Sequence, residues 1–190
     1  MNDIKLIRLI TSLLLTLVSC SVLAETTPQA DPRVSQSRMV VKTFGSELIG
    51  KLKHALGDGG PVTAINVCNI EAPKIATGLS EKHDLSIGRT SLKTRNADNN
   101  PDAWEKSVLQ MFEQRKQEGE AIAKIEYSEE TEQGFRYMKA IPTKGLCLTC
   151  HGETLSAPVK AALLKHYPDD TATGFNVGDI RGAFTIIQKN

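Results

Sequence analysis

Residues 122–141 read IAKIEYSEETEQGFRYMKAI, and this stretch decides the fold class. Its two ends, 122–127 and 134–141, are rich in the branched and aromatic side chains that favour strands. The acidic run between them, EETE, indicates a turn, so the two strands are expected to pair antiparallel. Residues 182–187 predict a further strand near the end of the chain. The centre of the domain is therefore expected to be an antiparallel sheet.

Helical patterns lie on both sides of these strands. Gly57-Asp58-Gly59-Gly60 separates the first helix from the second, and Pro73, which has no N–H for the preceding turn, should kink the second near Glu71. Residues 85–95 look extended. The order of these elements predicts an α+β fold with an antiparallel sheet flanked by helices. The predicted helices cover residues 34–56, 61–82, 101–119 and 158–166.

The composition excludes several classes of protein. The 190 residues are 40% apolar and 24% charged, with a formal net charge of +1. These values suit one soluble domain and argue against a disordered chain, a collagen-like repeat or a multispan membrane protein. No basic stripe accompanies the near-neutral charge, so nucleic acid is not an expected partner.

The N-terminus has the features of a targeting signal. Lys5 and Arg8 form a basic region that precedes a Leu-rich run over residues 9–23. This run is too short for a comfortable transmembrane helix. Small residues ending at Ala24 favour cleavage there, which predicts a signal peptide over 1–24 and an exported, periplasmic protein.

A second cleavage pattern overlaps the first. The letters LVSC at 17–20 resemble the lipobox of bacterial lipoproteins. In that alternative the signal ends at Ser19, and a lipid on Cys20 tethers the protein to a membrane, facing the periplasm. Residues 25–34 are polar with two prolines and read as a linker. The folded domain is expected to cover 35–190.

Cys147-Leu148-Thr149-Cys150-His151 has the spacing of a c-type haem attachment site. Cys147 and Cys150 can each attack a haem vinyl group, and His151 can then ligate the iron. Export supports this interpretation, because haem is coupled to such motifs outside the cytoplasm, where free thiols otherwise oxidise. A periplasmic thiol-disulfide oxidoreductase is an alternative, but its CxxC pair usually follows the first strand of a βαβ unit. Structural zinc would need further ligands.

The second axial position has several candidate donors. No methionine follows His151, which excludes the small cytochromes whose axial Met lies downstream. Cys68 falls on the apolar face of the second predicted helix, where a thiolate can bind iron and lower its reduction potential. A free cysteine there is explained equally well as a small buried hydrophobe. The other candidates are Met39, His54, His83, Met111, Met138 and His166.

Several segments resemble a known family. The segments are VCN at 67–69, GRTSLKTRN at 88–96, NPDAWE at 100–105, CLTCHG at 147–152 and GDIRGA at 178–183. Together, over about residues 35–188, they resemble a domain family of unknown function typified by a cyanobacterial soluble c-type haem protein. The same domain occurs as the sensory part of some membrane histidine kinases.

This resemblance implies a fold and a set of ligands. The fold would be PAS-like, with an antiparallel sheet flanked by helices around one covalent haem c. By the same resemblance, Cys147 and Cys150 attach the haem, His151 is one axial ligand of the iron and Cys68 is the other.

Cationic residues are expected beside the haem. In an extended 85–95 segment, Arg89, Lys93 and Arg95 share one face and can neutralise the haem propionates, although an exposed strand face also carries such charges without a ligand. No distal acid–base set is evident, so a catalyst is not expected. The expected function is electron transfer or redox sensing with an unidentified redox partner. The alternative is a sensor in which a diatomic gas displaces Cys68.

Overall fold

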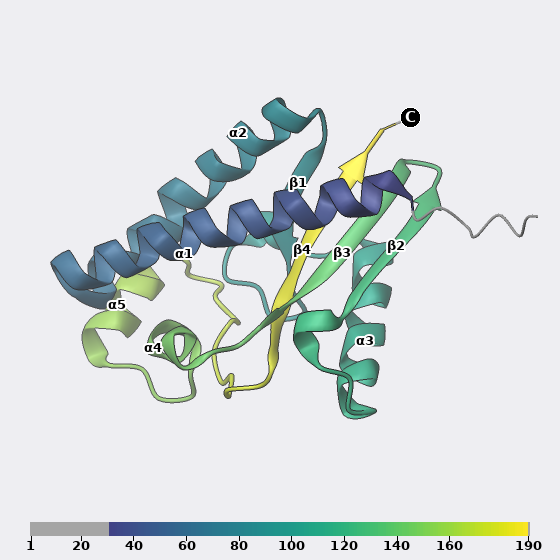
Figure 1. The fold of residues 1–190 in the computed structure, drawn as a ribbon. Coiled ribbons are helices and arrows are strands. Elements are labelled where there is room, and N and C mark those ends of the chain that lie inside the picture. Colours follow the sequence, from purple (N-terminus) through teal and green to yellow (C-terminus); the bar gives the residue numbers. More distant parts are fainter. Residues whose placement is uncertain (1–30, 190) are drawn as a thin grey trace, which may run out of the picture. The chain divides into compact units, whose positions relative to one another are not determined.

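Four strands form one antiparallel sheet in residues 31–189, the part of the chain that the computed structural model describes. The sheet order is β1-β4-β3-β2, so the β2–β3 hairpin lies at one edge and is followed across the sheet by the last strand and then by the first (Figure 1). The predicted α+β fold with an antiparallel sheet is confirmed. The strands are β1 (Ser86–Thr90), β2 (Glu126–Thr131), β3 (Gly134–Pro142) and β4 (Ile180–Gln188).

The β2–β3 hairpin is present, with its first strand shifted towards the acidic run. Residues Ile122–Lys124 form a short 3-10 turn, and β2 begins at Glu126. β2 is an edge strand, so Glu129 and Glu130 stay exposed while remaining in the ladder with β3. Charged side chains are well tolerated on an edge strand. The turn is therefore confined to residues 132–133.

The first two predicted helices are joined by a kink. α1 (Pro32–Asn66) contains one non-helical residue, Gly60, with φ 71° and ψ −169°. This conformation favours glycine, and Pro61 restarts the helix at a position where its missing N–H is harmless. α1 begins with Asp31 as its N-cap, so the end of the predicted linker 25–34 is helical instead. The predicted signal peptide and lipobox lie outside the described residues.

The kink predicted near Glu71 takes the form of a π-helical turn. This turn, η1 (Val67–Glu71), joins α1 to α2 (Ala72–His83). Pro73 has no N–H to donate to the turn before it. The Ala72 N–H donates to the carbonyl five residues back, which gives the wider π turn. Cys68 is one of the residues in this turn.

The extended segment predicted over 85–95 is shorter in the structure. β1 ends at Thr90. Ser91 Oγ then accepts a hydrogen bond from the Lys93 N–H (3.1 Å) and donates one to the Arg181 carbonyl (2.8 Å). Hydrogen bonds of a side chain thus replace the backbone hydrogen bonds of the strand. The single cationic face that a continuous strand would carry therefore does not form, and that expectation was wrong.

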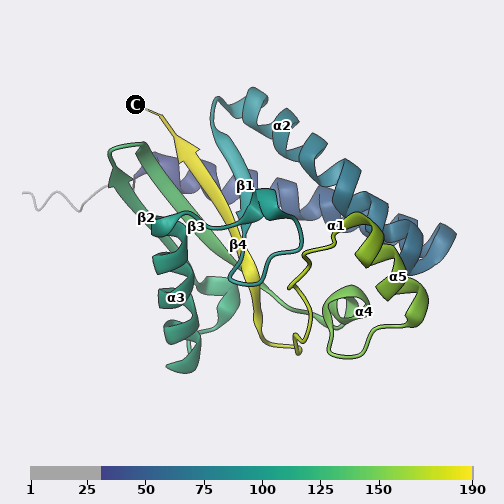
Figure 2. The ribbon, with the colours of Figure 1, turned by 180° about the vertical axis from the view of Figure 1, so that it is seen from behind.

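Helices cover both faces of the sheet. α1 and α2 pack on one face, where Phe44 and Tyr137 are buried. α3 (Ala103–Gln117) packs on the other face, where Phe112 and Met138 are buried. Figure 2 shows α3 in front of the sheet and α1 behind it. Within residues 31–189, no helix is both long and apolar enough to cross a membrane.

The segment that follows the CLTCH motif lies beside the second half of α1. Ile65 near the end of α1 packs with Leu155, Val159 and Leu163 in a separate apolar cluster. Figure 1 shows α4 and α5 together at this end of α1. The helices predicted at 101–119 and 158–166 are confirmed. The remaining elements are η2 (Ala97–Asn99), η4 (Gly145–Cys147), α4 (Leu148–His151) and α5 (Ala157–His166).

Candidate functional site

The CLTCH motif folds as a short helix at the wall of a cavity. A 3-10 turn leads directly into α4, so the motif is helical along its length. Residues three apart share one face of a helix, which lets Cys147 and Cys150 face the same space. Both line the cavity together with His151, and both thiols are free.

The His151 ring is oriented by a backbone carbonyl. Its Nδ1 lies 2.7 Å from the Ala172 oxygen. A carbonyl only accepts hydrogen bonds, so Nδ1 carries the hydrogen and Nε2 keeps a free lone pair. Burial, helped by nearby Arg181 and Arg95, holds the pKa of His151 well below its usual value. The ring is therefore neutral at pH 7 and presents Nε2 as a metal-binding atom.

A buried ion pair fixes the carbonyl that His151 contacts. Arg95 Nε donates to Asp170 (3.0 Å), and its Nη2 donates to the carbonyls of Cys150 and Ala172. The Arg95 and Asp170 side chains are only 8% and 9% exposed. Asp170 also accepts the Ala172 N–H (2.8 Å). One ion pair thus ties the motif helix to the loop that orients its histidine.

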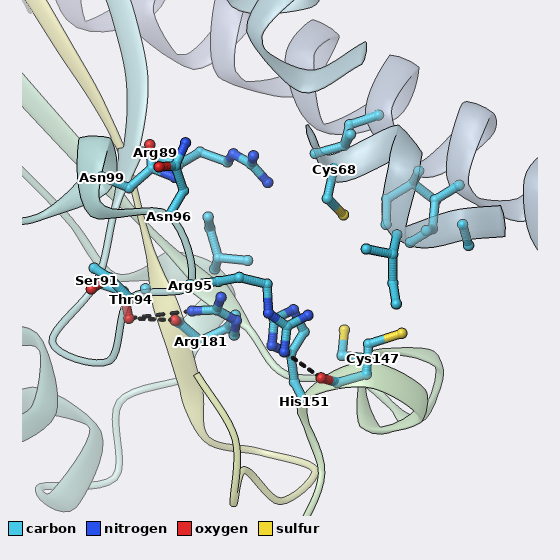
Figure 3. A pocket seen from close by; sticks show the side chains of 18 of the residues that line it. Cys68, Arg89, Ser91, Thr94, Arg95, Asn96, Asn99, Cys147, His151 and Arg181 are labelled. Atoms are coloured by element: carbon cyan, nitrogen blue, oxygen red, sulfur yellow. Dashed lines mark hydrogen bonds between the residues drawn. The ribbon is translucent and has the colours of Figure 1, made fainter. Parts of the chain in front are cut away.

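Cys68 enters the same cavity from the wall formed by α1 and the π turn. Its thiol is free, and it lines the cavity. Figure 3 shows the Cys68 sulfur pointing into the space bordered by Cys147 and His151. Of all the donors considered for the second axial position, Cys68 alone lines this cavity.

The other candidate donors lie elsewhere. Met138 is buried on the opposite face of the sheet, and Met111 packs against the same cluster. His83, half-buried at the end of α2, does not line the cavity. The exposed donors are Met39, His54 and His166.

The cavity has an apolar wall and a polar end. None of the described residues that line it is acidic, although several are cationic. This combination suits a large apolar ligand that carries its own negative charge. The apolar wall includes Leu48, Ile49, Leu52, Leu56 and Ile65 from α1. The polar end comprises Arg89, Ser91, Thr94, Arg95, Asn96, Asn99 and Arg181.

The three cations predicted to meet the ligand have different positions. Arg89 and Arg95 line the cavity, but Arg95 is already neutralised by Asp170. Lys93 does not line this cavity, although Thr94 and Arg95 of the same segment do. Its ammonium lies 5.2 Å from the centre of the Phe175 ring instead.

Arg181 is a cation of the cavity that sequence reasoning missed. β3 pairs Ile141 with Gly182 and Pro142 with Ile180, so Arg181 is the extra residue of a β-bulge. A bulge redirects a side chain that regular alternation would place elsewhere. The glycine after Arg181 inside a strand pattern was the available signal, since glycine there often marks a bulge.

The alternative chemistries have less support in this geometry. Within residues 31–189, no three His, Cys, Asp or Glu side chains converge on one point, so the arrangement does not suit a bare metal ion held by several protein ligands. The CxxC pair also does not follow the first strand of a βαβ unit, as it usually does in thiol-disulfide oxidoreductases, because all the strand pairs of the described sheet are antiparallel.

The residues fit a haem. His151 and Cys68 enter one cavity from different elements, and the His151 Nε2 and the Cys68 sulfur are both atoms that can bind iron. Cys147 and Cys150 precede the histidine in the same short motif, and their free thiols have the spacing that thioether attachment requires. The apolar α1 wall suits the porphyrin, and the guanidiniums left without a carboxylate suit its propionates.

Comparisons with known proteins agree on one family. The family model described as Tll0287-like matches residues 17–188. A solved structure, "Crystal structure of the cyanobacterial heme-protein Tll0287", matches with a TM-score of 0.66 at 21% sequence identity. The match covers 85% of this chain and 98% of that one. A comparison with curated proteins finds no match.

Proposed function

Because this chain belongs to the Tll0287-like family, we propose that it is an exported single-haem c-type cytochrome that works in electron transfer or redox sensing. The observation that carries the proposal is the meeting of Cys68, Cys147, Cys150 and His151 in one cavity. The solved structure with this fold is that of a cyanobacterial heme-protein.

The four residues have distinct roles in this proposal. Cys147 and Cys150 form the thioether bonds, one from each thiol to a vinyl group of the haem. His151 supplies the first axial ligand through Nε2, with its tautomer set by Ala172. Cys68 supplies the second as a thiolate, which favours a low reduction potential. When bound, the haem supplies an iron centre that exchanges one electron.

The protein's own contribution is to hold these ligands. The Arg95–Asp170 pair fixes the loop behind His151 and donates to the Cys150 carbonyl. The α1 wall excludes water from the porphyrin face. With both axial ligands supplied by the protein, no coordination position is open to a substrate, which favours electron transfer or sensing over catalysis.

Export is part of the same proposal. The basic and Leu-rich N-terminus is the feature that supports it, because covalent haem attachment takes place outside the cytoplasm. Cleavage after Ala24 would release the protein into the periplasm, and cleavage before Cys20 would leave it lipid-anchored there. Its partner would be another redox protein.

Covalent attachment tests the proposal directly. We expect the exported protein to retain its haem after denaturation and acid–acetone extraction, seen by the alkaline pyridine spectrum. The Cys147→Ser/Cys150→Ser double variant should lose all haem under the same treatment. Thr149→Ala, inside the same motif, should retain it and is the matched control. Extraction of haem from the unaltered protein would rule out c-type attachment.

A second function, sensing of a diatomic gas, is favoured by the π turn. Cys68 lies in this turn, and π turns are uncommon and concentrate at functional sites. A π turn can relax to the narrower α-helical turn, which would move the residues it contains. Such a change would withdraw Cys68 from the cavity and open one axial position.

Carbon monoxide separates the two functions. For a sensor, CO added to the reduced protein should change the Soret absorption, and its binding rate should reach a plateau at high CO because departure of Cys68 limits it. Cys68→Ser should bind CO without the plateau. An unchanged spectrum at saturating CO would leave electron transfer as the function. Stopped-flow absorption makes both measurements.

A further inference from the structure

The cavity carries more positive charge than the described residues neutralise. Three guanidiniums line it, those of Arg89, Arg95 and Arg181. Asp170 neutralises one of them by its contact with Arg95. Arg89 and Arg181 are half-buried, and a cation withdrawn from water is costly unless it is paired, so these two charges suit a ligand that brings its own anions.

Arg95 already uses two of its three guanidinium nitrogens in contacts with the protein. Its Nε is taken by Asp170, and its Nη2 donates to two backbone carbonyls, those of Cys150 and Ala172. A guanidinium has five N–H donors, but this one is locked in place as structural support. Its charge is also already balanced.

Arg89 has no polar partner among the described residues. It lies on β1 directly opposite Phe184 of β4, and both residues face the α1 side of the sheet. Its guanidinium carbon stands 5.6 Å from the centre of the Phe44 ring. Burial lowers the pKa of Arg89, in line with a charge held without a counter-ion.

Arg181 is aimed at the same space by the bulge in β4. Its Nη1 donates to Ser91 Oγ (3.3 Å) and to the Lys93 carbonyl (3.2 Å), which leaves its other N–H groups free. Gly182 permits this geometry, since it has φ 154° and a Cβ there would lie 2.3 Å from a backbone oxygen of Thr90. Burial, together with Arg95 and Arg89, lowers the pKa of Arg181 to about 10.

We propose that Arg89 and Arg181 form a clamp of two guanidiniums that binds the two haem propionates, one guanidinium to each propionate. This rests on the proposed function. Guanidinium and carboxylate are matched for bidentate, charge-assisted hydrogen bonds. Figure 3 shows both side chains reaching in from the sheet, on the side away from Cys147. A haem carries its propionates on the edge away from its vinyl groups, so attachment at Cys147 and Cys150 directs them towards this clamp.

The test compares three cation-removing variants in the loaded protein. They are Arg89→Gln, Arg181→Gln and, as the matched control, Lys93→Gln, which removes a cation outside the cavity. The clamp requires the first two to shift the propionate bending bands of the resonance Raman spectrum. In both variants the equilibrium between the ferric and ferrous forms should also shift towards the ferric form by at least about tenfold. This shift is a fall in reduction potential of about 59 mV for one electron.

Conservative variants guard against a purely structural explanation. Arg89→Lys and Arg181→Lys keep the charge, so they should recover most of the potential but not the bidentate propionate bands. The proposal is overturned if Lys93→Gln changes the potential as much as the arginine variants do, or if the Raman bands stay the same in both glutamine variants. Absence of covalent haem from the unaltered protein would instead remove the proposed function on which the clamp rests.

Discussion

Replacing Cys68 by Ser should abolish the thiolate-type low-spin EPR signal of the ferric protein and raise its reduction potential by on the order of a tenth of a volt. Serine preserves the size of the side chain, but its hydroxyl stays protonated and binds iron far more weakly than a thiolate. The haem itself should remain attached, because Cys147 and Cys150 are unchanged. EPR at low temperature and a potentiometric titration measure the two effects.

The π turn provides the control for this substitution. Asn69→Ser alters the neighbouring residue, which is exposed and does not line the cavity. It should leave both the EPR signal and the potential unchanged. If Cys68→Ser gives the same spectrum as the unaltered protein, Cys68 is not an iron ligand and is simply a small, half-buried residue on the cavity wall.

Asp170→Asn should destabilise the folded protein by about 3–5 kcal/mol, the usual cost of removing one partner from a buried ion pair. The pair is buried on both sides, with 8% and 9% of the two side chains exposed. The loss is large because Arg95 would be left buried without a counter-ion beside two further guanidiniums. Urea unfolding followed by circular dichroism gives the free energy of unfolding.

An exposed ion pair serves as the comparison that shows whether burial causes the expected loss of stability. Lys51 and Glu71 are 2.8 Å apart with side chains 49% and 29% exposed. Lys51→Gln should therefore cost less than about 1 kcal/mol. The double variant Arg95→Leu/Asp170→Leu should be less damaging than Asp170→Asn, because it removes both charges together. Equal losses for Asp170→Asn and Lys51→Gln would mean that the pair contributes little to stability.

The elements that could be predicted are those with strong periodicity. α3 buries Val108, Leu109 and Phe112 on one face, and this spacing is plain in the sequence. The second strand of the hairpin was predicted over 134–141 and is observed at Gly134–Pro142. The CLTCH motif can also be recognised from sequence, because the chemistry proposed for it depends on local spacing.

The features that could not be predicted arise from contacts between distant segments. β1 ends at Thr90 because Ser91 bonds to the Arg181 carbonyl, 90 positions later in the chain. The bulge that aims Arg181 into the cavity depends on its register with β3. Of the three predicted cations, only Arg89 lines the cavity with an unbalanced charge. Arg95 is neutralised by Asp170, and no local sequence pattern reveals that pairing.

The sheet order has a consequence for how the molecule assembles. β1, near the start of the domain, pairs with β4 at its end and not with β2, the next strand along the chain. Cys68 and Arg89 therefore come from the first half of the chain, whereas the haem motif and Arg181 come from the second half. Such non-local pairing makes loop closure slow. β4 lies between β1 and β3 and contributes Arg181 to the pocket, so the pocket is complete only when both of these strand pairs have formed.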